Sequence, residues 1–308
     1  MPPPYASAHD VVAVVVTYQP DIALLTRLIV ALSPQVKALL IVDNGTGVSL
    51  DVLQIPSNGA KLSLIRLERN LGVATAQNVG IRWSRGQQVN FVILMDQDSV
   101  PADDMVERLY SAIITRPDAA AMGPRYIDNR QGNPPPFIRI RRFKLERCGC
   151  DNEYSIVPVD YLISSGCMVP IAVLDKVGGL RDNLFVDYVD IEWGLRASYY
   201  GFQCYGVCSA HMAHSLGDQP IGFLGKKFPA RGALRHYYMF RNALLLYRES
   251  WIPINWKLVD GWRLLLKYVF YSLFAKPRSS QFLMMTLGIW HGLIGKSGEF
   301  KYDTKSSR

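Results

Sequence analysis

The chain has 308 residues, of which 49% are hydrophobic and 19% are charged, and its mean hydropathy is +0.06. This length accommodates one large domain plus an appended segment, and the apolar content excludes a disordered chain. The net charge of +8 is unevenly distributed. Residues 221–308 hold 15 Lys/Arg and 4 Asp/Glu, whereas residues 1–220 hold 19 Lys/Arg and 22 Asp/Glu. The sequence therefore predicts a first domain over 1–220 and a basic, helical, amphipathic region over 221–308.

Aromatic residues alternate with the charges of this C-terminal region, as in Trp251, Trp256, Trp262, Tyr268 and Phe270. That mixture is typical of a surface that docks on anionic lipid headgroups. No uncharged apolar run reaches about 18 residues, so Leu258–Phe274 and Phe282–Ile294 are interpreted as interfacial helices and not as spanning ones. Two alternatives remain: a helical dimer or domain interface, and a nucleic-acid surface, although the chain lacks a zinc, helix-turn-helix or RNA-binding signature.

Five cysteines occur, an odd number: Cys148, Cys150, Cys167, Cys204 and Cys208. The start of the chain lacks the charged and apolar regions of a signal peptide, so reduced thiols in the cytoplasm are expected. Cys204 and Cys208 have no second pair nearby with zinc-site spacing, and we expect both to be buried thiols.

The first hundred residues alternate between strand and helix patterns. Val11–Thr17 is a β-branched run typical of a buried parallel strand, and a helical pattern of leucines follows it. The next expected elements are the strand Val36–Asp43, the strand Leu62–Leu67, the helix Gly72–Trp83 and the strand Asn90–Met95. This alternation predicts an α/β fold with a mixed, mostly parallel sheet flanked by helices.

The second half is expected to continue with a helix that starts near Pro101, because proline fits the first turn of a helix. The Pro- and Arg-rich stretch Gly132–Cys150 is interpreted as a flexible insertion. We then expect a strand over Tyr161–Gly166, a helix over Val186–Tyr200, a strand over Phe202–Val207, helices to about Ile294 and a loose tail over Lys296–Arg308.

Polar residues follow four successive elements of this pattern: Thr17, Asp43, Asn70 and Asp96. In parallel sheets, ligands bind outside the carboxyl ends of the strands. One such residue would mean little, but four of them indicate a single binding edge.

Asp96-Gln97-Asp98 directly follows a buried strand, so both carboxylates can reach one cation. Hard oxygen ligands suit Mg²⁺ or Mn²⁺, and an imidazole from His214 could join them. The alternative is a pair of solvated loop acids.

Three further groups of residues have a plausible chemical role. Asp43 could accept the imide N–H of a pyrimidine base, and Asn70-x-Gly72 and Asn78-x-Gly80 could border a phosphate at a helix N-terminus. Among Asp187, Asp190 and Glu192, a carboxylate could serve as the general base for a sugar hydroxyl. The alternatives are plain turns, helix caps and acids that favour a helix N-terminus.

Taken in order, these segments resemble one known family. The segments are VVVTYQP, VDNGT, ERNLGVATAQNVGI, ILMDQDS, SSG, FVDYVDIEWGLRASYYGF, HSLG, RHYYMFRNALLL and GIWHGLIGKSG. Together they resemble the bacterial rhamnosyltransferases of glycosyltransferase family 2, which have the GT-A fold, over roughly residues 10–297. The set departs from the wider family at Val189-Asp190, where many members carry Glu-Asp, so Asp187 or Glu192 could share the role of the missing glutamate.

The resemblance implies a role for each matching residue. Asp190 corresponds to the catalytic base, and Asp96, Asp98 and His214 correspond to the metal ligands of a DxD-type site. The implied donor-binding residues are Thr17, Asp43, Asn70, Gly72, Asn78 and Asp96. The implied acceptor-side residues are Ser165, Gly166, Asp187 and Arg241, of which Arg241, with Asn242, could meet a diphosphate.

The resemblance also implies an activity: inverting, metal-dependent transfer of L-rhamnose from dTDP-β-L-rhamnose, with Mg²⁺ or Mn²⁺. The implied acceptor is a glycan, or an oligosaccharide linked to polyprenyl diphosphate, in cell-surface polysaccharide synthesis such as that of O-antigen. The enzyme would lie peripherally on the cytoplasmic, inner face of the bacterial cell membrane and would bind no nucleic acid. Two alternatives are another family-2 hexosyl or galactofuranosyl transferase that uses a UDP-sugar, and a catalytically silent, membrane-associated glycan-binding protein.

Overall fold

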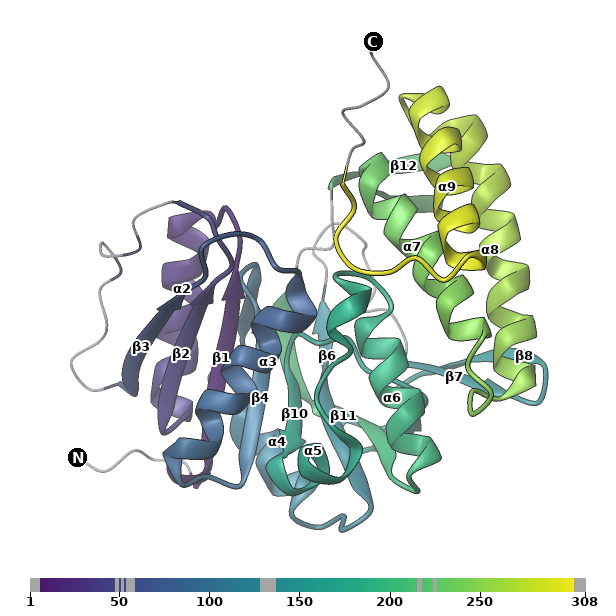
Figure 1. Ribbon diagram of the computed structural model, residues 1–308. Coiled ribbons are helices and arrows are strands. Elements are labelled where there is room, and N and C mark those ends of the chain that lie inside the picture. The colour runs from purple at the N-terminus through teal and green to yellow at the C-terminus, as the bar shows by residue number, and fades with distance from the viewer. Residues whose placement is uncertain are drawn as a thin grey trace.

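The computed structural model describes residues 6–47, 50, 53, 59–127, 137–214, 218–223 and 226–301, with only the backbone described for 127, 214, 218–223 and 226–230. A central sheet is flanked by helices, and the C-terminal helices stand beside its upper edge (Figure 1). The order of the hydrogen-bonded strands is β3-β2-β1-β4-β10-β6-β11-β5, with β9 also paired to β11. The sheet is mixed and mostly parallel with helices on both faces, as predicted.

The first half of the sheet is parallel. Its strands are β1 (Val11–Thr17), β2 (Ala38–Asp43), β3 (Lys61–Arg66) and β4 (Phe91–Asp96). The even-numbered residues of β1 pack with α3 (Val73–Ser84), and the odd-numbered residues pack with α2 (Ile22–Leu32) and α4 (Met105–Ile113). Both faces of β1 are therefore buried, which is why its sequence is a continuous apolar run.

Antiparallel strands complete the other half. β10 (Cys167–Pro170) runs antiparallel between β4 and β6 (Ala119–Ile127), and β11 (Gln203–His214) runs parallel to β6. β5 (Ser99–Pro101) and β9 (Ile156–Val159) both pair antiparallel with β11. The remaining short elements are α1 (Ser7–Asp10), α5 (Ile171–Val177), α6 (Val189–Tyr199), β12 (Asp218–Phe223), β13 (Lys226–Ala230) and the 3-10 turns 33–35, 85–87 and 182–184.

Three sequence predictions were wrong in this half. Pro101 ends β5 and does not open a helix, since its neighbours pair with β11 and α4 begins only at Met105. Residues 161–166 form a loop, and the strand starts at Cys167. The presumed flexible insertion contains a hairpin of β7 (Phe137–Arg141) and β8 (Lys144–Cys148), whereas residues 132–136 lie outside the described part. Long-range pairing, which local sequence patterns do not encode, decided the first two, whereas the hairpin pairs residues that are close in the chain.

A disulfide joins Cys150, just after β8, to Cys208 in β11, with 5.7 Å between the Cα atoms. The expectation that all thiols are reduced is wrong for this pair, whereas Cys148, Cys167 and Cys204 are free. The register of β11 against β6 shifts between Val207 and His211, and the Cys208 N–H donates to the Ser155 carbonyl. That irregularity brings the strand next to a cysteine 58 positions away, a proximity the sequence does not reveal.

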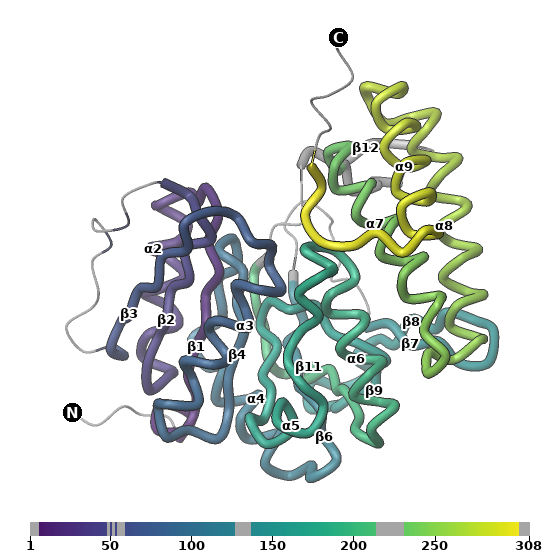
Figure 2. The backbone as a smooth tube through the Cα atoms, viewed as in Figure 1, coloured from purple at the N-terminus to yellow at the C-terminus, as the bar shows by residue number. Residues whose placement is uncertain are grey.

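The C-terminal region, predicted to be helical over 221–308, is helical from Ala233, whereas β12 and β13 pair as an antiparallel hairpin before it. Its helices are α7 (Ala233–Tyr247), α8 (Ile254–Phe274) and α9 (Arg278–Leu293), and the backbone trace in Figure 2 shows them gathered into one bundle. Most of α7 is buried, while α8 and α9 cover it. None of the described helices is both long and apolar enough to cross a membrane.

The segment after α9 is not loose where it is described. It turns back toward the sheet (Figure 1), the Phe300 N–H donates to the Tyr238 hydroxyl over 2.7 Å, and Glu299 pairs with Arg69 at 2.7 Å. The prediction of a loose tail is therefore wrong for residues 296–301, and residues 302–308 lie outside the described part.

The contact between α3 and β1 depends on Gly80. A Cβ atom at this position would lie 2.1 Å from Cγ1 of Val14, inside a packed core. Gly80→Ala should therefore lower the free energy of unfolding by about 1–3 kcal/mol through overpacking, although alanine is the better helix former. Urea denaturation measures this. Gly86→Ala is the matched control because a Cβ there meets nothing within 4 Å, and equal stability of both variants would contradict the prediction.

Candidate active site

Three of the predicted site residues, Thr17, Asp43 and Asp96, lie at the carboxyl ends of neighbouring strands. Thr17 is the register partner of Asp43, and Val16 is the partner of Asp96. These strand ends lie at the upper edge of the sheet, on the side where the C-terminal helices stand (Figure 1). The structure therefore brings Thr17, Asp43 and Asp96 to one edge, where parallel sheets bind ligands.

Thr17 and Asp43 are two buried polar residues that lie side by side at this edge. The Thr17 Oγ1 atom is buried and has no hydrogen-bond partner among the described residues. Oδ1 of Asp43 accepts the Thr46 N–H at 3.0 Å. A buried hydroxyl without a partner carries a desolvation cost, so a polar ligand group such as a nucleobase would restore its hydrogen bond.

Asn70 and Gly72 shape the next loop. Nδ2 of Asn44 donates to Oδ1 of Asn70 at 3.0 Å, and the same oxygen accepts the Gly72 N–H at 2.9 Å. Gly72 has φ +87°, and a Cβ there would lie 2.6 Å from the Phe185 carbonyl oxygen. The Val73 N–H donates to that carbonyl at 2.8 Å, so the donor-side turn touches the loop before α6. Only glycine permits this approach.

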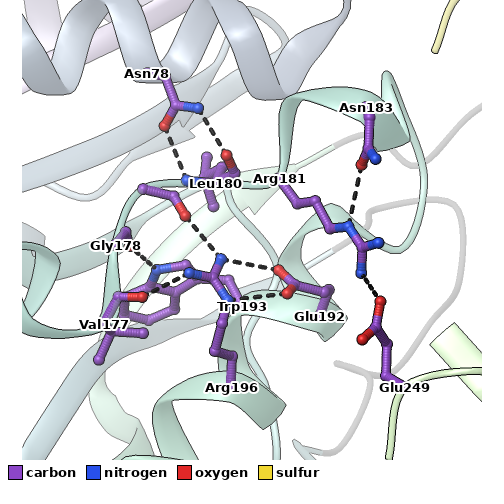
Figure 3. Close-up of polar contacts among 11 residues, drawn as sticks. Asn78, Val177, Gly178, Leu180, Arg181, Asn183, Glu192, Trp193, Arg196 and Glu249 are labelled. Carbon is purple, nitrogen blue, oxygen red and sulfur yellow. Dashed lines mark hydrogen bonds and ion pairs between the residues drawn. The ribbon is translucent and has the colours of Figure 1, made fainter. Parts of the chain in front are cut away.

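Asn78 has a structural role in place of the predicted place in a donor pocket. Its Nδ2 donates to the Leu180 carbonyl at 2.7 Å and to Oδ1 of Asp182 at 2.6 Å, while its Oδ1 accepts the Leu180 N–H at 2.8 Å. Figure 3 shows the side chain pointing from α3 onto this segment. The amide thus fastens α3 to the segment that leads into α6.

The Asp96-Gln97-Asp98 turn is held from two sides. Gln97 exchanges two hydrogen bonds with the Tyr18 backbone, at 2.7 and 3.0 Å. On the other side, Oγ of Ser165 accepts the Asp96 N–H at 3.1 Å and lies 2.7 Å from Oγ of Ser99. Ser165 is fully buried, so it supports the turn from behind and does not face the acceptor as predicted.

Gly166 belongs to the same support. Its N–H donates to the Leu94 carbonyl at 2.8 Å, and its φ is +77°. A Cβ at this position would lie 2.5 Å from Cγ of Pro124. Its predicted place on the acceptor side is replaced by a packing role under β4.

The side chains near the Asp96-Gln97-Asp98 turn have the chemistry of ligands for a hard divalent cation. Asp96 and Asp98 supply carboxylate oxygens at the turn, and β5 pairs with β11 so that His214 is the register partner of Ser99. The His214 side chain lies outside the described residues. Among the described side chains, no three His, Cys, Asp or Glu residues gather closely enough to hold a metal. Two aspartates with an imidazole brought beside them would fit Mg²⁺ or Mn²⁺.

Asp190 stands in the first turn of α6 and is half-buried. Its Oδ1 accepts the Ile191 N–H at 2.9 Å, and it borders a small cavity lined mainly by apolar residues, among them Leu94, Cys167 and Trp193. Burial, followed by the negative charges of Asp187 and Asp96, raises the pKa of Asp190 to about 6. A carboxylate with this pKa is well suited to accept a proton near neutral pH.

Asp187 binds two arginines. Nη1 of Arg231 lies 2.5 Å from Oδ1 of Asp187, and Arg235 makes two bonds to the same carboxylate at 2.7 and 2.9 Å. Burial alone would raise the pKa of Asp187, but the two guanidinium groups outweigh it and lower the pKa. Asp187 is therefore an anchor for cations and not a second base. Arg235 also interacts electrostatically with Asp96 and Asp190, which places positive charge beside the catalytic edge.

Arg231 and Arg235 were missed by the sequence reasoning. Arg235 lies in the first turn of α7 and Arg231 directly before its N-cap, Gly232, so no helical spacing in the sequence marks them as a pair.

Comparisons with known proteins decide the family. Residues 12–167 match the sequence profile described as "Glycosyl transferase family 2". The chain belongs to glycosyltransferase family 2. It is 35% identical over 247 residues to the dTDP-rhamnosyl transferase RfbF of Shigella flexneri, covering 80% of this chain and 82% of that protein. It is 24% identical over 245 residues to the low-salt glycan biosynthesis hexosyltransferase Agl10 of Haloferax volcanii, covering 75% of each.

Solved structures agree with the GT-A fold of this glycosyltransferase. A crystal structure of GalNAc-T7 with UDP, GalNAc and Mn²⁺ superposes with a TM-score of 0.56 at 12% identity, covering 87% of this chain and 58% of that one. A crystal structure of S. aureus TarS 1–349 superposes with a TM-score of 0.55 at 14% identity, covering 92% and 80%. At these identities the likeness concerns the fold alone.

Within the glycosyltransferase, Glu192 is structural. It is buried and pairs with Arg196 through two bonds of 2.9 and 3.0 Å, and Arg196 also donates to the Val177 and Gly179 carbonyls (Figure 3). The carboxylate of Glu192, in the first turn of α6, is thus fully paired with Arg196. It cannot share the role of the base, which leaves Asp190 as the carboxylate that this helix presents.

Arg241 and Asn242 join α7 to the loop before α6. Nδ2 of Asn242 donates to the carbonyls of Leu184, Val186 and Asp187 at 2.8–2.9 Å, and Arg241 donates to the carbonyls of Leu184 and Gly298. Both side chains are fully buried. The prediction that they meet a diphosphate is therefore replaced: they position the loop that carries Asp187 and leads to Asp190.

Asn242→Asp should test this positioning role. The substitution keeps the shape but replaces the donating amide with an acceptor, so the carbonyls of Leu184, Val186 and Asp187 lose this donor and repel the new charge. We expect unfolding free energy to fall by about 1–3 kcal/mol. We also expect kcat to fall about tenfold to a hundredfold in the folded enzyme because the base is displaced.

Asn255→Asp is the matched control, since Asn255 likewise donates to a backbone carbonyl, that of Arg142 at 2.7 Å, but far from the loop. Denaturation and steady-state kinetics of both variants provide the measurement. A normal kcat in folded Asn242→Asp would show that this contact does not position the base.

Proposed function

We propose that this glycosyltransferase transfers L-rhamnose from dTDP-β-L-rhamnose to a glycan acceptor with inversion at the anomeric carbon. The observation that carries the proposal is a carboxylate with a pKa near 6, Asp190, beside the edge that carries Thr17, Asp43 and Asp96. The 35% identity to a dTDP-rhamnosyl transferase supports the choice of donor.

In the proposed reaction Asp190 removes the proton of the acceptor hydroxyl while that oxygen attacks the anomeric carbon. At neutral pH most of this carboxyl is ionised, because its pKa is about 6. The nucleotide diphosphate leaves from the opposite face of the sugar, as in single displacements of inverting glycosidases, and no covalent enzyme nucleophile takes part. Glu192 and Asp187 stay in their ion pairs throughout.

The donor would lie along the upper edge of the sheet. Thr17 and Asp43 would hold the base, Asn70 and Gly72 would border the donor, and Asp96 would lie near the ribose. Asp98 and Asp96, with His214, would hold Mg²⁺ or Mn²⁺, which when bound would neutralise charge on the leaving diphosphate. Arg235, beside Asp96, would add positive charge on the same side.

A second candidate is a family-2 hexosyl or galactofuranosyl transfer from a UDP-sugar. It is favoured by the 24% identity to a hexosyltransferase. Uracil and thymine present the same imide group, so Thr17 and Asp43 could bind either base. The two donors differ in the thymine methyl group, in the 2′-hydroxyl that only UDP carries, and in the sugar.

Donor turnover tests the proposal directly. We expect the wild-type enzyme with Mg²⁺ or Mn²⁺ to turn over dTDP-L-rhamnose and not UDP-glucose or UDP-galactofuranose. Asp190→Asn should lower kcat about 10²–10⁴-fold because the proton acceptor is lost. Its affinity for dTDP, measured by calorimetry, should be unchanged because Asp190 does not belong to the donor edge.

Asp175→Asn is the control, since Asp175 forms only an exposed ion pair with Arg85. The pH profile is a second readout: kcat/KM should fall below about pH 6 as Asp190 is protonated. Preference for a UDP-sugar would favour the second candidate, and normal turnover by Asp190→Asn would remove Asp190 as the base.

We further propose that α8 and α9 dock the enzyme on the cytoplasmic face of the membrane, near an acceptor linked to polyprenyl diphosphate. Large apolar side chains on these helices face outward, and Trp262 is 61% exposed. The other exposed ones include Leu258, Leu265, Leu266, Val269, Leu273, Phe282, Leu283, Trp290 and Leu293. With Lys276 and Arg278 exposed between the helices, this surface has the chemistry of an anionic bilayer interface.

Flotation with phosphatidylglycerol-containing vesicles tests this docking. Trp262→Glu should weaken partitioning about tenfold or more, because it removes a large apolar group and adds a repelled charge. Ile114→Glu is the matched control, since Ile114 is similarly exposed but lies at the C-terminal end of α4. Equal flotation of Trp262→Glu and wild type would contradict the docking, and a concentration-dependent dimer that Trp262→Glu dissociates would favour an interface between copies.

A further inference from the structure

α8 is amphipathic in an unusual sense: its outward face is apolar and its inward face is charged. Asp260, Arg263 and Lys267 recur at i, i+3 and i+7, on the face that carries the buried residues Leu264 and Tyr271. Asp260 anchors this face. Its Oδ2 accepts the hydroxyls of Tyr188, directly before α6, at 2.8 Å and of Tyr247, in α7, at 2.7 Å.

Lys267 is a cation with too few partners. Its side chain is half-buried, and the only hydrogen-bond contact of its Nζ among the described residues is a weak one of 4.0 Å to Sδ of Met239. An ammonium group has three donors, and leaving them unpaired away from bulk water is costly. Burial accordingly lowers the pKa of Lys267.

Positive charge exceeds negative charge around this lysine. Lys267 interacts electrostatically with Arg263, Arg231, Asp260 and Asp187. Asp187 is already paired with two arginines, whereas Asp260 accepts two hydroxyl hydrogen bonds and keeps its negative charge. Arg263 forms no ion pair or hydrogen bond within the described part of the chain and takes part only in these electrostatic contacts. Of these acids, Asp260 alone is therefore left to balance two cations, Arg263 and Lys267.

Tyr161 connects this pair of cations to Asp190. Tyr161 packs against α6 at Gly194, one turn after Asp190, where a Cβ would lie 2.8 Å from Cβ of Tyr161. The Tyr161 hydroxyl interacts electrostatically with both Asp190 and Arg263. Tyr161 thus lies between Asp190 and the inward face of α8.

We propose that Arg263 and Lys267 bind the phosphate or diphosphate group that links the acceptor sugar to its carrier, with Tyr161 between this group and Asp190. This assignment deepens the proposed function and rests on it for the carrier-linked acceptor and for Asp190 as the base. Paired arginine and lysine donors suit a phosphate through charge-assisted hydrogen bonds, and the apolar outer face of the same helix would hold the carrier at the bilayer. In this assignment, the phosphate of the bound acceptor supplies the partner that Lys267 lacks.

The test measures anion binding by calorimetry to the full chain saturated with dTDP and Mg²⁺, so that the donor edge is filled. The probes are inorganic pyrophosphate, farnesyl diphosphate below its micellar concentration, and farnesol. Wild type should bind both anions, and farnesyl diphosphate more tightly. Lys267→Met and Arg263→Gln should each weaken both anions about tenfold or more, because each removes charged hydrogen bonds. Lys61→Met, exposed at the start of β3, should leave both affinities unchanged.

Thermal unfolding separates binding from structure. Lys267→Met should keep or raise the melting temperature, because methionine needs no partner, and a lysine with a structural role would show the opposite. Unchanged anion affinity in both variants, or no anion binding by wild type, overturns the proposal, and so does binding of farnesol equal to that of farnesyl diphosphate. Failure of wild type to bind dTDP would instead contradict the donor assignment, while the contrast between variants would still locate the anion site.

Discussion

The catalytic edge depends on the bonds from Arg241 and Asn242 to the carbonyls of the loop before α6. In that loop Phe185, Asp187 and Tyr188 all have positive φ, a conformation that side-chain-bearing residues adopt only when their surroundings enforce it. The side-chain amide of Asn242 binds three carbonyls of this loop, and the guanidinium of Arg241 binds one of them as well, so these two side chains enforce its conformation. The strained loop in turn meets Gly72 on the donor side and leads to Asp190, so donor turn and base share one support.

This arrangement ties the C-terminal helices to the loop before α6, so they are not an appendage. α7 supplies the loop's partners, Arg231 and Arg235 hold Asp187, and Glu299 in the returning tail pairs with Arg69 beside the donor turn. A buried charge is tolerated only when it is paired and hydrogen-bonded, and each of Arg241, Asp187 and Glu192 meets that condition. Lys267 does not, which is why it indicates a ligand.

The two faces of α8 then acquire separate tasks. Its apolar residues point away from the protein, and its charged residues point toward the base. A soluble helix would reverse this pattern. Together with the exposed apolar side chains of α9, the arrangement would fix the depth at which a carrier-linked acceptor meets Asp190, with the phosphate at the cations and the lipid at the outer face.

The sequence by itself determined the parallel half of the sheet, because the β-branched run Val11–Thr17 and the alternating elements leave little choice of architecture. It also determined which polar residues end the strands, since strand ends are local features. It also carried the family, through the order of its motifs. Only the tertiary structure decided which polar residues face a ligand: Asn78, Ser165 and Arg241 look functional in sequence but bind backbone or support turns. Likewise the Cys150–Cys208 disulfide and the cations at Arg231, Arg235 and Lys267 depend on contacts between residues far apart in the chain, which no local pattern encodes.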